Sequence, residues 1–459
     1  MSGPEAGTGG REGDPARAEL TRAIRLPHAV AMVVGTIIGA SIFVQPSEIS
    51  GHVPTVSGVF LVWAVSGILT LFGALVCAEL ASMYPRSGGV YVFLRESFGP
   101  WLGFLWGWAM FWTMHSGIIA AIATVFARYT AYFAPMSDTG LRVVAIGLIL
   151  VLSVVNWLGV RQGSRVQTLF TAGKLIAIAA MIVLGFTLGG GARVADPVVA
   201  GAAPGGAPAY GVGDFALALV AGLFAYGGWH MVTYSADETV DAARTIPRSL
   251  GIGVVIVTGC YILLNAVYLY VLPVSVVASS ERIAADAADA VVGGGGGALM
   301  AGLVMFSTFG GLAGIVLAGP RVYYAMARDG LIFRWMGGIH PRYRTPHRAI
   351  ALQAIWSSVL VATGSYRELF TRVIYTEWIF FGLMALGLLL LRRRGMRGPY
   401  RVASGAILPA VFAFSAFAIV ANQIIRSPGQ SVLGLAMVVA GLPIYLVWGR
   451  GRIRVADVS

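Results

Sequence analysis

The chain has 459 residues, of which 57% are hydrophobic and only 11% charged, and its formal net charge is +12. A water-soluble protein of this composition would expose mostly apolar surface and would aggregate, so a soluble globular fold is excluded. Because the arginines lie at the ends of apolar runs, the positive charge indicates membrane topology and not a nucleic-acid partner.

Residues 1–26 are rich in Gly, Glu and Arg and lack the apolar run of a signal peptide, so we expect a disordered cytoplasmic tail. About twelve apolar runs follow, most of them near the roughly 20 residues that a membrane-spanning helix needs. The ninth is short. The predicted spans are 28–49, 56–82, 101–128, 141–158, 168–188, 214–236, 250–272, 298–320, 349–364, 373–391, 406–425 and 432–449.

Arginine distribution predicts the orientation of these spans. With twelve spans, both termini lie on the same side of the membrane. The termini and the even-numbered connections carry 24 arginines, and the other connections carry seven. Cytoplasmic connections are enriched in Lys and Arg, so we expect both termini, including the tail 450–459, to be cytoplasmic in a multi-pass protein of the cell membrane.

Three long connections differ in composition. Residues 189–213 are rich in Gly, Ala and Pro and are expected to be irregular. The Ala-rich spacing of 274–290 predicts a short external helix. Residues 321–348 carry Arg, Tyr and Trp at intervals that suit a helix lying at the cytoplasmic interface.

Two spans contain glycines where an apolar helix is expected to continue. The first contains GTIIGASIF, Gly35–Phe43, and the sixth contains FAYGGWHM, Phe224–Met231. A glycine inside a helix costs about 1 kcal/mol relative to alanine, and each pattern alone also fits close helix packing. The two occupy matching places if spans 1–5 and 6–10 are repeats, and interrupted helices at matching places indicate a transporter site.

An interrupted helix offers the two kinds of group that an amino-acid zwitterion needs. The start of the second half-helix presents backbone N–H groups, which bind a carboxylate. The end of the first half-helix presents carbonyl groups, which accept from an ammonium group. The backbone is therefore the predicted recognition element for the substrate.

Several stretches also carry a family resemblance. In chain order, they are Gly35–Phe43, PRSGGVY from Pro85 to Tyr91, Phe98–Trp108, FTAGKL from Phe170 to Leu175, FAYGGW from Phe224 to Trp229, Tyr261–Asn265, STFG from Ser307 to Gly310, and Pro399–Val402. With these, the chain resembles the amino acid–polyamine–organocation superfamily, specifically bacterial relatives of the L-type amino-acid transporters.

The resemblance implies an all-α integral membrane protein with the LeuT-type fold. The expected organisation is a ten-helix core, 27–391, made of inverted repeats 28–188 and 214–391, followed by two additional helices within 392–449. It implies a secondary transporter of L-amino acids that works by alternating access, with no enzymatic activity and no cofactor.

The resemblance also implies a substrate site at the two interrupted spans. The backbone of the first break meets the α-amino and α-carboxyl groups, and an aromatic gate in the second covers them. These residues are Ile37, Gly39, Ala40 and Ser41 in span 1 and Phe224 (the gate), Ala225 and Gly227 in span 6.

The chain departs from the family pattern at several places in this region. Ser41 stands where the family has glycine, and His230 and Met231 stand where L-type members have Asn and Tyr. Like His115 in the third span, His230 could contribute to a pocket that senses pH or binds a polar side chain. A lone membrane histidine such as His115 often only bonds a backbone carbonyl, so both interpretations stay open.

Eukaryotic L-type members tether an accessory glycoprotein through a cysteine between spans 3 and 4. Residues 129–140 contain no cysteine, and Cys77 and Cys260 both lie in apolar runs. No disulfide-linked accessory subunit is therefore expected, and no thiolate metal site.

Lys174, in span 5, is the single lysine of the chain. A charge at mid-membrane costs roughly 2.5–3.5 kcal/mol on the insertion scale, so this lysine should have a partner or a task. The resemblance places it where sodium-coupled relatives bind their ion, between spans 1 and 8, with Gly35, Ser307 and Thr308 as neighbours. The hypothesis that follows is sodium-independent transport, with Lys174 linking the two moving halves and, as an additional role left open, exchanging a proton.

Two alternative functions fit the sequence less well. A cationic amino-acid or polyamine antiporter of the same superfamily would favour an acidic residue in the pocket, and none is adjacent to Gly39 or Gly227. Glu377, expected near the outer face, and Glu79, expected near the inner face, are interpreted as structural or gating residues. A membrane-embedded enzyme is remote, because the sequence contains no HExxH or GxSxG motif and no paired intramembrane carboxylates.

Overall fold

The computed structural model describes residues 24–86, 88–158, 164–190, 210–343 and 345–449. The predicted tails, up to residue 23 and from residue 450, and most of the connection 189–213 lie outside these ranges. Within them, the chain forms helices and no named strand. The backbone of Ile24 is bonded to Glu238 and Val240 (N···O 3.0 and 2.9 Å), so regular contacts begin just before the first helix.

The described part of the chain contains nine helical segments that are long and apolar enough to cross a membrane. They confirm the all-α membrane fold class. Their elements are α3 (Val56–Met83), α5 (Pro100–Ala109) with η2 (Met110–Met114) and α6 (His115–Phe133), α7 (Asp138–Trp157), α8 (Ser164–Leu188), α9 (Val212–Ala225) with η4 (Trp229–Glu238), α10 (Ala242–Val271), α13 (Gly296–Arg328), α15 (Tyr366–Arg393) and α16 (Ile407–Arg426).

The three other predicted spans coincide with shorter helices. The ninth is a 17-residue helix, which agrees with its short apolar run. The first and the last are interrupted, so neither forms one long helix. The elements are α1 (Leu26–Ile37), η1 (Ser41–Phe43) and α2 (Gln45–His52) for the first, α14 (His347–Thr363) for the ninth, and α17 (Pro428–Val439) and α18 (Gly441–Gly449) for the last.

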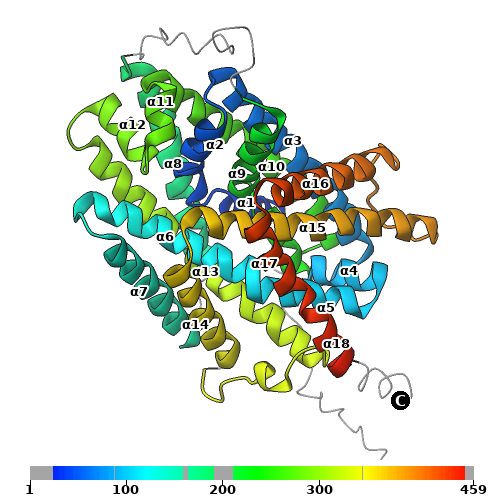
Figure 1. Cartoon of the computed structure of the whole chain (residues 1–459). Helices are drawn as coiled ribbons and strands as arrows, with labels where there is room; N and C mark the ends of the chain where they lie inside the picture. Colours follow the sequence, from blue (N-terminus) through cyan, green and yellow to red (C-terminus); the bar gives the residue numbers. More distant parts are fainter. Residues whose placement is uncertain (1–23, 87, 159–163, 191–209, 344, 450–459) are drawn as a thin grey trace, which may run out of the picture.

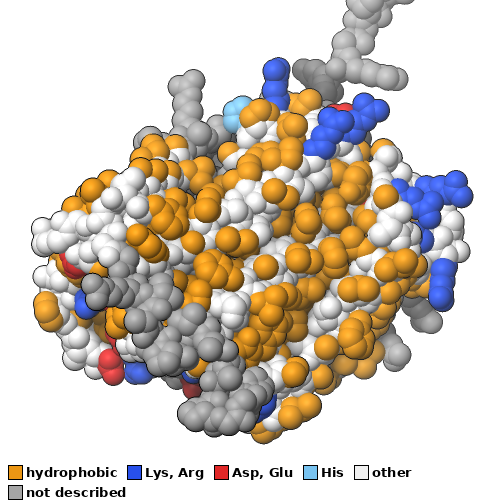
Figure 2. Space-filling view, turned by 90° about the horizontal axis from the view of Figure 1, so that it is seen from above, with side chains coloured by type: hydrophobic (Ala, Val, Ile, Leu, Met, Phe, Trp, Pro, Cys, Tyr) orange, Lys and Arg blue, Asp and Glu red, His pale blue; other side chains and the backbone are white. Residues whose placement is uncertain are grey.

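Apolar side chains cover the outside of the bundle. Val143, Ile176 and Phe414 are 64%, 68% and 76% exposed, which in water would be unfavourable and in lipid is favourable. Figure 2 shows hydrophobic side chains spread across one face, with most of the Lys and Arg side chains gathered along its edge. This distribution is that of a membrane-embedded surface flanked by charged ends.

The interrupted helices lie inside the bundle. Figure 1 shows α1, α9 and α10 near its middle, with α15 and α16 on one side and the pair α7 and α14 on another. Helix α10 packs along α3 and α1, and α15 packs along α16 and α6. The core therefore places both interruptions away from lipid.

Two of the connections differ from the prediction. The helical stretch 274–290 is confirmed, but it forms two helices, α11 (Val274–Ser279) and α12 (Ile283–Val292). The predicted interfacial helix in 321–348 is wrong: α13 continues to Arg328, and only the short η5 (Arg334–Gly337) follows. Tyr323 and Met326 are buried, and this packing extends α13.

Candidate functional site

The first interruption separates α1 from η1. Helix α1 ends at Ile37, Ile38 leaves the helical region (φ −71°, ψ 83°), and Gly39 N bonds Ile37 O at 2.7 Å. A new 3-10 turn begins at Ser41. Because carbonyls at a helix end have no intrahelical partner, those of α1 must find other donors.

Side chains from two distant helices supply these donors. The ammonium group of Lys174, on α8, donates to Ile38 O (3.1 Å) and to Gly35 O (3.4 Å). The hydroxyl of Tyr261, on α10, lies 3.0 Å from Ile37 O. Lys174 is 3% exposed, so these carbonyls solvate its charge inside the protein.

The second interruption, between α9 and η4, depends on glycine. Helix α9 ends at Ala225, and Gly228 adopts φ 94°, a left-handed conformation that favours glycine. A Cβ atom on Gly228 would lie 3.0 Å from Thr36 O, so the glycine also lets the two interrupted helices approach closely.

Tyr261 connects the two interruptions. Its hydroxyl, 3.0 Å from Ile37 O, is also 2.9 Å from Ala225 O, the last carbonyl of α9. The ring is fully buried and packs on Trp63 and Tyr226. In the sequence Tyr261 stood out only as part of a matching stretch, since nothing local shows which carbonyls a tyrosine on another helix will reach.

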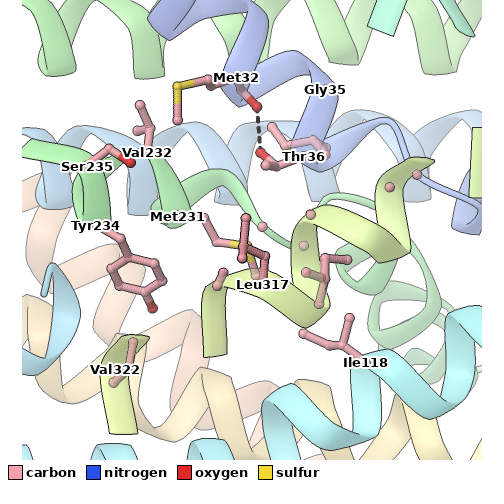
Figure 3. A pocket seen from close by; sticks show the side chains of 18 of the residues that line it. Met32, Gly35, Thr36, Ile118, Met231, Val232, Tyr234, Ser235, Leu317 and Val322 are labelled. Carbon is pink, nitrogen blue, oxygen red and sulfur yellow. Dashed lines mark hydrogen bonds between the residues drawn. The ribbon is translucent and has the colours of Figure 1, made fainter. Parts of the chain in front are cut away.

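A cavity of about 770 Å³ lies between the two interruptions. Figure 3 shows Met231 from η4, Leu317 from α13 and Ile118 from α6 around it, with Tyr234 reaching into the space. Most of the predicted site residues line this cavity, whereas Ala225, Ser307, His115 and His230 do not. The predicted residues that line it are Gly35, Ile37, Gly39, Ala40, Ser41, Lys174, Phe224, Gly227, Met231 and Thr308.

The two histidines have other surroundings. His115 Nε2 lies 2.8 Å from Ile315 O on α13, so this ring makes the carbonyl bond that was one of its two interpretations. His230 packs edge-on against Trp106, Trp229 and Phe381, and both histidines are buried. Their placement gives no support to a histidine-lined pocket.

The expected neighbours of Lys174 are found in part. Gly35 accepts from it as expected, and Ile38, which was not expected, is the nearer acceptor. Thr308 Oγ1 instead donates to Val304 O within its own helix. Among the described residues, the hydrogen bonds of the lysine thus go to α1 and the residue that follows it, and none reaches α13.

Aromatic rings close one end of the cavity. The Phe224 ring lies 5.4 Å from Phe370 and 6.5 Å from Tyr366, measured between ring centroids. Gln45 Nε2 donates to the Tyr366 hydroxyl at 3.0 Å, and Glu48 pairs with Arg367. This seal ties α2 and α9 to the start of α15.

The other end of the cavity reaches charged residues, several of them exposed. Its lining there includes Arg86, Arg95, Arg321 and Asp329. Tyr91, on α4 (Val90–Phe98), donates to Asp329 at 2.8 Å, and Arg95 lies 3.4 Å from the same carboxylate. Burial and this hydrogen bond raise the pKa of Tyr91, so its hydroxyl stays a neutral donor.

The two membrane glutamates have different settings. Glu79 is buried and paired with Arg392 (Nε···Oε1 2.8 Å), which agrees with a structural role. The expected position of Glu377 near the outer face is wrong. Helix α15 begins at Tyr366, so Glu377 lies about 16 Å along it. It is 4% exposed and lines the cavity. The predicted span began at residue 373, which placed Glu377 too close to the end of the helix.

A buried cavity between two interrupted membrane helices, sealed at one end and reaching exposed residues at the other, defines a membrane transporter. The amino acid permease family model matches residues 24–448. The chain therefore belongs to the amino acid permease family, which is a family of transporters and not of enzymes.

Individual relatives cover most of the chain. The b(0,+)-type amino acid transporter 1 of Homo sapiens is 30% identical over 95% of this chain and 89% of its own. The large neutral amino acids transporter small subunit 2 of Homo sapiens is 31% identical over 97% and 82%. The serine/threonine exchanger SteT of Bacillus subtilis (strain 168) is 32% identical over 93% and 96%. The chain is an amino-acid transporter of the membrane.

Proposed function

We propose that this permease moves L-amino acids with neutral side chains by alternating access, without sodium. The single observation that carries the proposal is the cavity that both interruptions line, with Phe224 at its sealed end. The backbone from Ile37 to Ser41 and the backbone at Gly227 bind the α-amino and α-carboxyl groups, while Ala225 lies behind the cavity lining with its carbonyl bonded to Tyr261. Apolar lining residues such as Ile118 and Met231 support a neutral side chain.

The described conformation is an inward-open one in this proposal. The arginine-rich connections, which the positive-inside rule assigns to the cytoplasm, include Arg86 and Arg95 at the exposed end of the cavity. Phe224, Phe370 and Tyr366 then form the closed external gate. Both termini are cytoplasmic on the same argument.

Lys174 replaces sodium in this mechanism. Its ammonium group bonds the carbonyls of Gly35 and Ile38, which are the kind of oxygen ligands that a sodium ion would use. A fixed charge there stabilises the interruption of α1 without an ion. Uptake should therefore be the same in sodium and in choline buffers.

No disulfide-linked accessory subunit is part of the proposal. The chain has two cysteines. Cys77 on α3 is buried, and Cys260 lies within α10. Neither is on an external connection where a partner's cysteine could reach it.

The alternative is a cationic amino acid as substrate, because the cavity does contain one buried carboxyl, Glu377. Counterflow into liposomes separates the two. Liposomes that contain the protein and are preloaded with unlabelled amino acid should take up labelled L-serine, L-threonine or L-leucine. They should not take up L-arginine, L-lysine or putrescine. Exchange of only the cationic compounds would reverse the assignment, and no exchange of any amino acid would refute the proposed function.

The gate has its own test. Phe224→Ala removes the ring that contacts Phe370 and Tyr366, so the external end no longer closes. We expect loss of counterflow in a protein that still elutes as a folded species. Wild-type counterflow would contradict the gate assignment.

A further inference from the structure

Glu377 is a buried acidic group for which the proposed function has no use. It lies midway along α15, is 4% exposed and lines the central cavity. Within the described part of the chain, no hydrogen bond or ion pair reaches its carboxyl group. A lone carboxylate at this depth is unfavourable unless something neutralises it.

The charged and titratable groups of the surrounding helices do not supply that partner. Lys174 is bonded to backbone carbonyls at the end of α1, and His115 is bonded to Ile315 O. Glu79 is paired with Arg392. Tyr91 and Arg95 both contact Asp329. Arg128 lies over the Tyr366 ring, and Asp214 accepts from Gly211 N. Tyr234 on η4 lines the cavity together with Glu377, and its neutral hydroxyl is another weak acid that supplies no positive charge. The other titratable and charged groups on these elements include Cys77 on α3, Glu96 on α4, Tyr129 and Tyr132 on α6, His230 and Glu238 on η4, Arg321, Tyr323 and Tyr324 on α13 and Arg426 on α16.

The lining of the cavity argues against a cationic ligand as the missing partner. Its charged residues include four basic groups, Lys174 among them, and three acidic ones, of which only Glu377 is deeply buried. A site built for a second cation would need an excess of carboxylates. A proton needs one carboxyl group and access to water, and Glu377 has both through the cavity. The charged lining residues are Arg86, Arg95, Lys174, Arg321, Glu238, Asp329 and Glu377.

The same face of α15 carries the seal. Tyr366, Phe370, Ile374 and Glu377 are spaced by four, four and three residues, so they follow one side of the helix. The first two close the outer end against Phe224, and the last two line the cavity. Opening the seal would hydrate this face from the other side, so Glu377 would face each side in turn.

We propose that Glu377 binds and releases a proton during the transport cycle, so that amino-acid uptake by this permease is coupled to a proton gradient. The carboxyl group takes up a proton from the external side when the seal is open and releases it when the cavity faces the cytoplasm. This inference rests on the proposed function, and it adds the coupling ion to it.

The test uses the full chain in liposomes, with labelled L-serine and L-leucine as probes and a pH indicator inside. Counterflow at equal pH first tests the proposed function alone. An inward proton gradient is then applied to liposomes without internal amino acid. We expect accumulation of the label and proton entry that depends on the added amino acid. Counterflow without such proton entry overturns this inference and leaves the proposed function standing.

Two variants locate the effect. Glu377→Gln should reduce the ratio of gradient-driven uptake to counterflow, with proton entry at the level of protein-free liposomes. The matched control is Glu368→Gln at the start of the same helix, where glutamine can keep the capping box with Ser365, and it should keep the wild-type ratio. Proton entry retained in Glu377→Gln overturns the proposal.

If Glu377→Gln also loses counterflow, the Glu377→Asp variant decides. Recovery of amino-acid-dependent proton entry in Glu377→Asp supports the proposal, since the acid alone has been restored. The proposal is overturned if Glu377→Asp recovers counterflow without proton entry, or if it recovers neither activity. In both cases the carboxyl group serves substrate binding or folding.

Discussion

The two interruptions that frame the cavity are built differently. Between α9 and η4, the chain turns at Gly228, whose φ of 94° and close approach to Thr36 O are both available to glycine alone. Between α1 and η1, the freed carbonyls are bonded by Lys174 from α8 and Tyr261 from α10. One break is specified by its own residues and the other by side chains far away in the sequence.

This difference indicates which break can change during transport. A turn fixed by a positive φ keeps its shape when neighbouring helices move. A break completed by donors on α8 and α10 changes when those helices shift relative to α1. We therefore expect substitutions at Gly228 to damage the site itself and substitutions at Lys174 or Tyr261 to alter how α1 is held.

The largest effect is expected for Gly228→Ala. The positive φ and the contact with Thr36 O together should destabilise the protein by about 4 kcal/mol, with loss of uptake. Thermal unfolding in detergent and liposome counterflow measure both. The control is Gly259→Ala in α10, where a Cβ meets nothing within 4 Å and stability should be unchanged or higher. Equal behaviour of the two variants would contradict a glycine-specified break.

Lys174→Met should have the next largest effect. It removes the donor to Ile38 O and Gly35 O while keeping an apolar chain of similar length. Unpaired buried carbonyls destabilise, and removal of a buried ammonium group offsets part of this, so we expect a loss of about 1–3 kcal/mol. Counterflow of the variant should be lower than that of the wild type. It should be equal in sodium and in choline buffers. A variant that gains sodium dependence would show that the ion site is still formed.

The sequence predicted the break between α9 and η4 more completely than the break between α1 and η1. The reason is again that the former is specified by its own residues and the latter by distant side chains. Paired glycines at 227 and 228 are a local signal, and the structure places the turn there. A lone lysine in an apolar run signals only that some partner exists. The family resemblance implied Gly35, which does accept from the lysine, whereas Ile38 was not foreseen. Apolar run lengths predicted the membrane helices because lipid acts on every residue of a span.

Contacts between distant helices were beyond sequence reasoning. Tyr261 reaches Ile37 O and Ala225 O only because α10 packs along α1 and against η4, the element that follows α9. The depth of Glu377 depended on where α15 begins, which is set by the cap at Ser365 and not by hydropathy. His115 finds Ile315 O on a helix about 200 residues away. Such partners follow from packing, which periodicity does not encode.

Tyr261→Phe tests whether one hydroxyl joins the two breaks. The ring packing on Trp63 and Tyr226 is kept, so the loss should be about 1 kcal/mol. We expect a lower thermal midpoint in detergent and reduced counterflow with the same order of substrate preference. Tyr270→Phe on the same helix, which is 37% exposed, should match the wild type. If both variants match the wild type, the Tyr261 hydroxyl does not hold the breaks together.

Ser41→Gly gives the smallest and most discriminating effect, because it makes the first break richer in glycine, like the second. Ser41 is the first residue of η1 and lines the cavity. If donors from α8 and α10 hold this break, added backbone freedom should lower stability by only about 0.5 kcal/mol. Counterflow should persist, since the recognising groups are backbone atoms. A loss of transport as large as that of Gly228→Ala would mean that residue 41 itself, and not Lys174 and Tyr261, fixes the shape of the break.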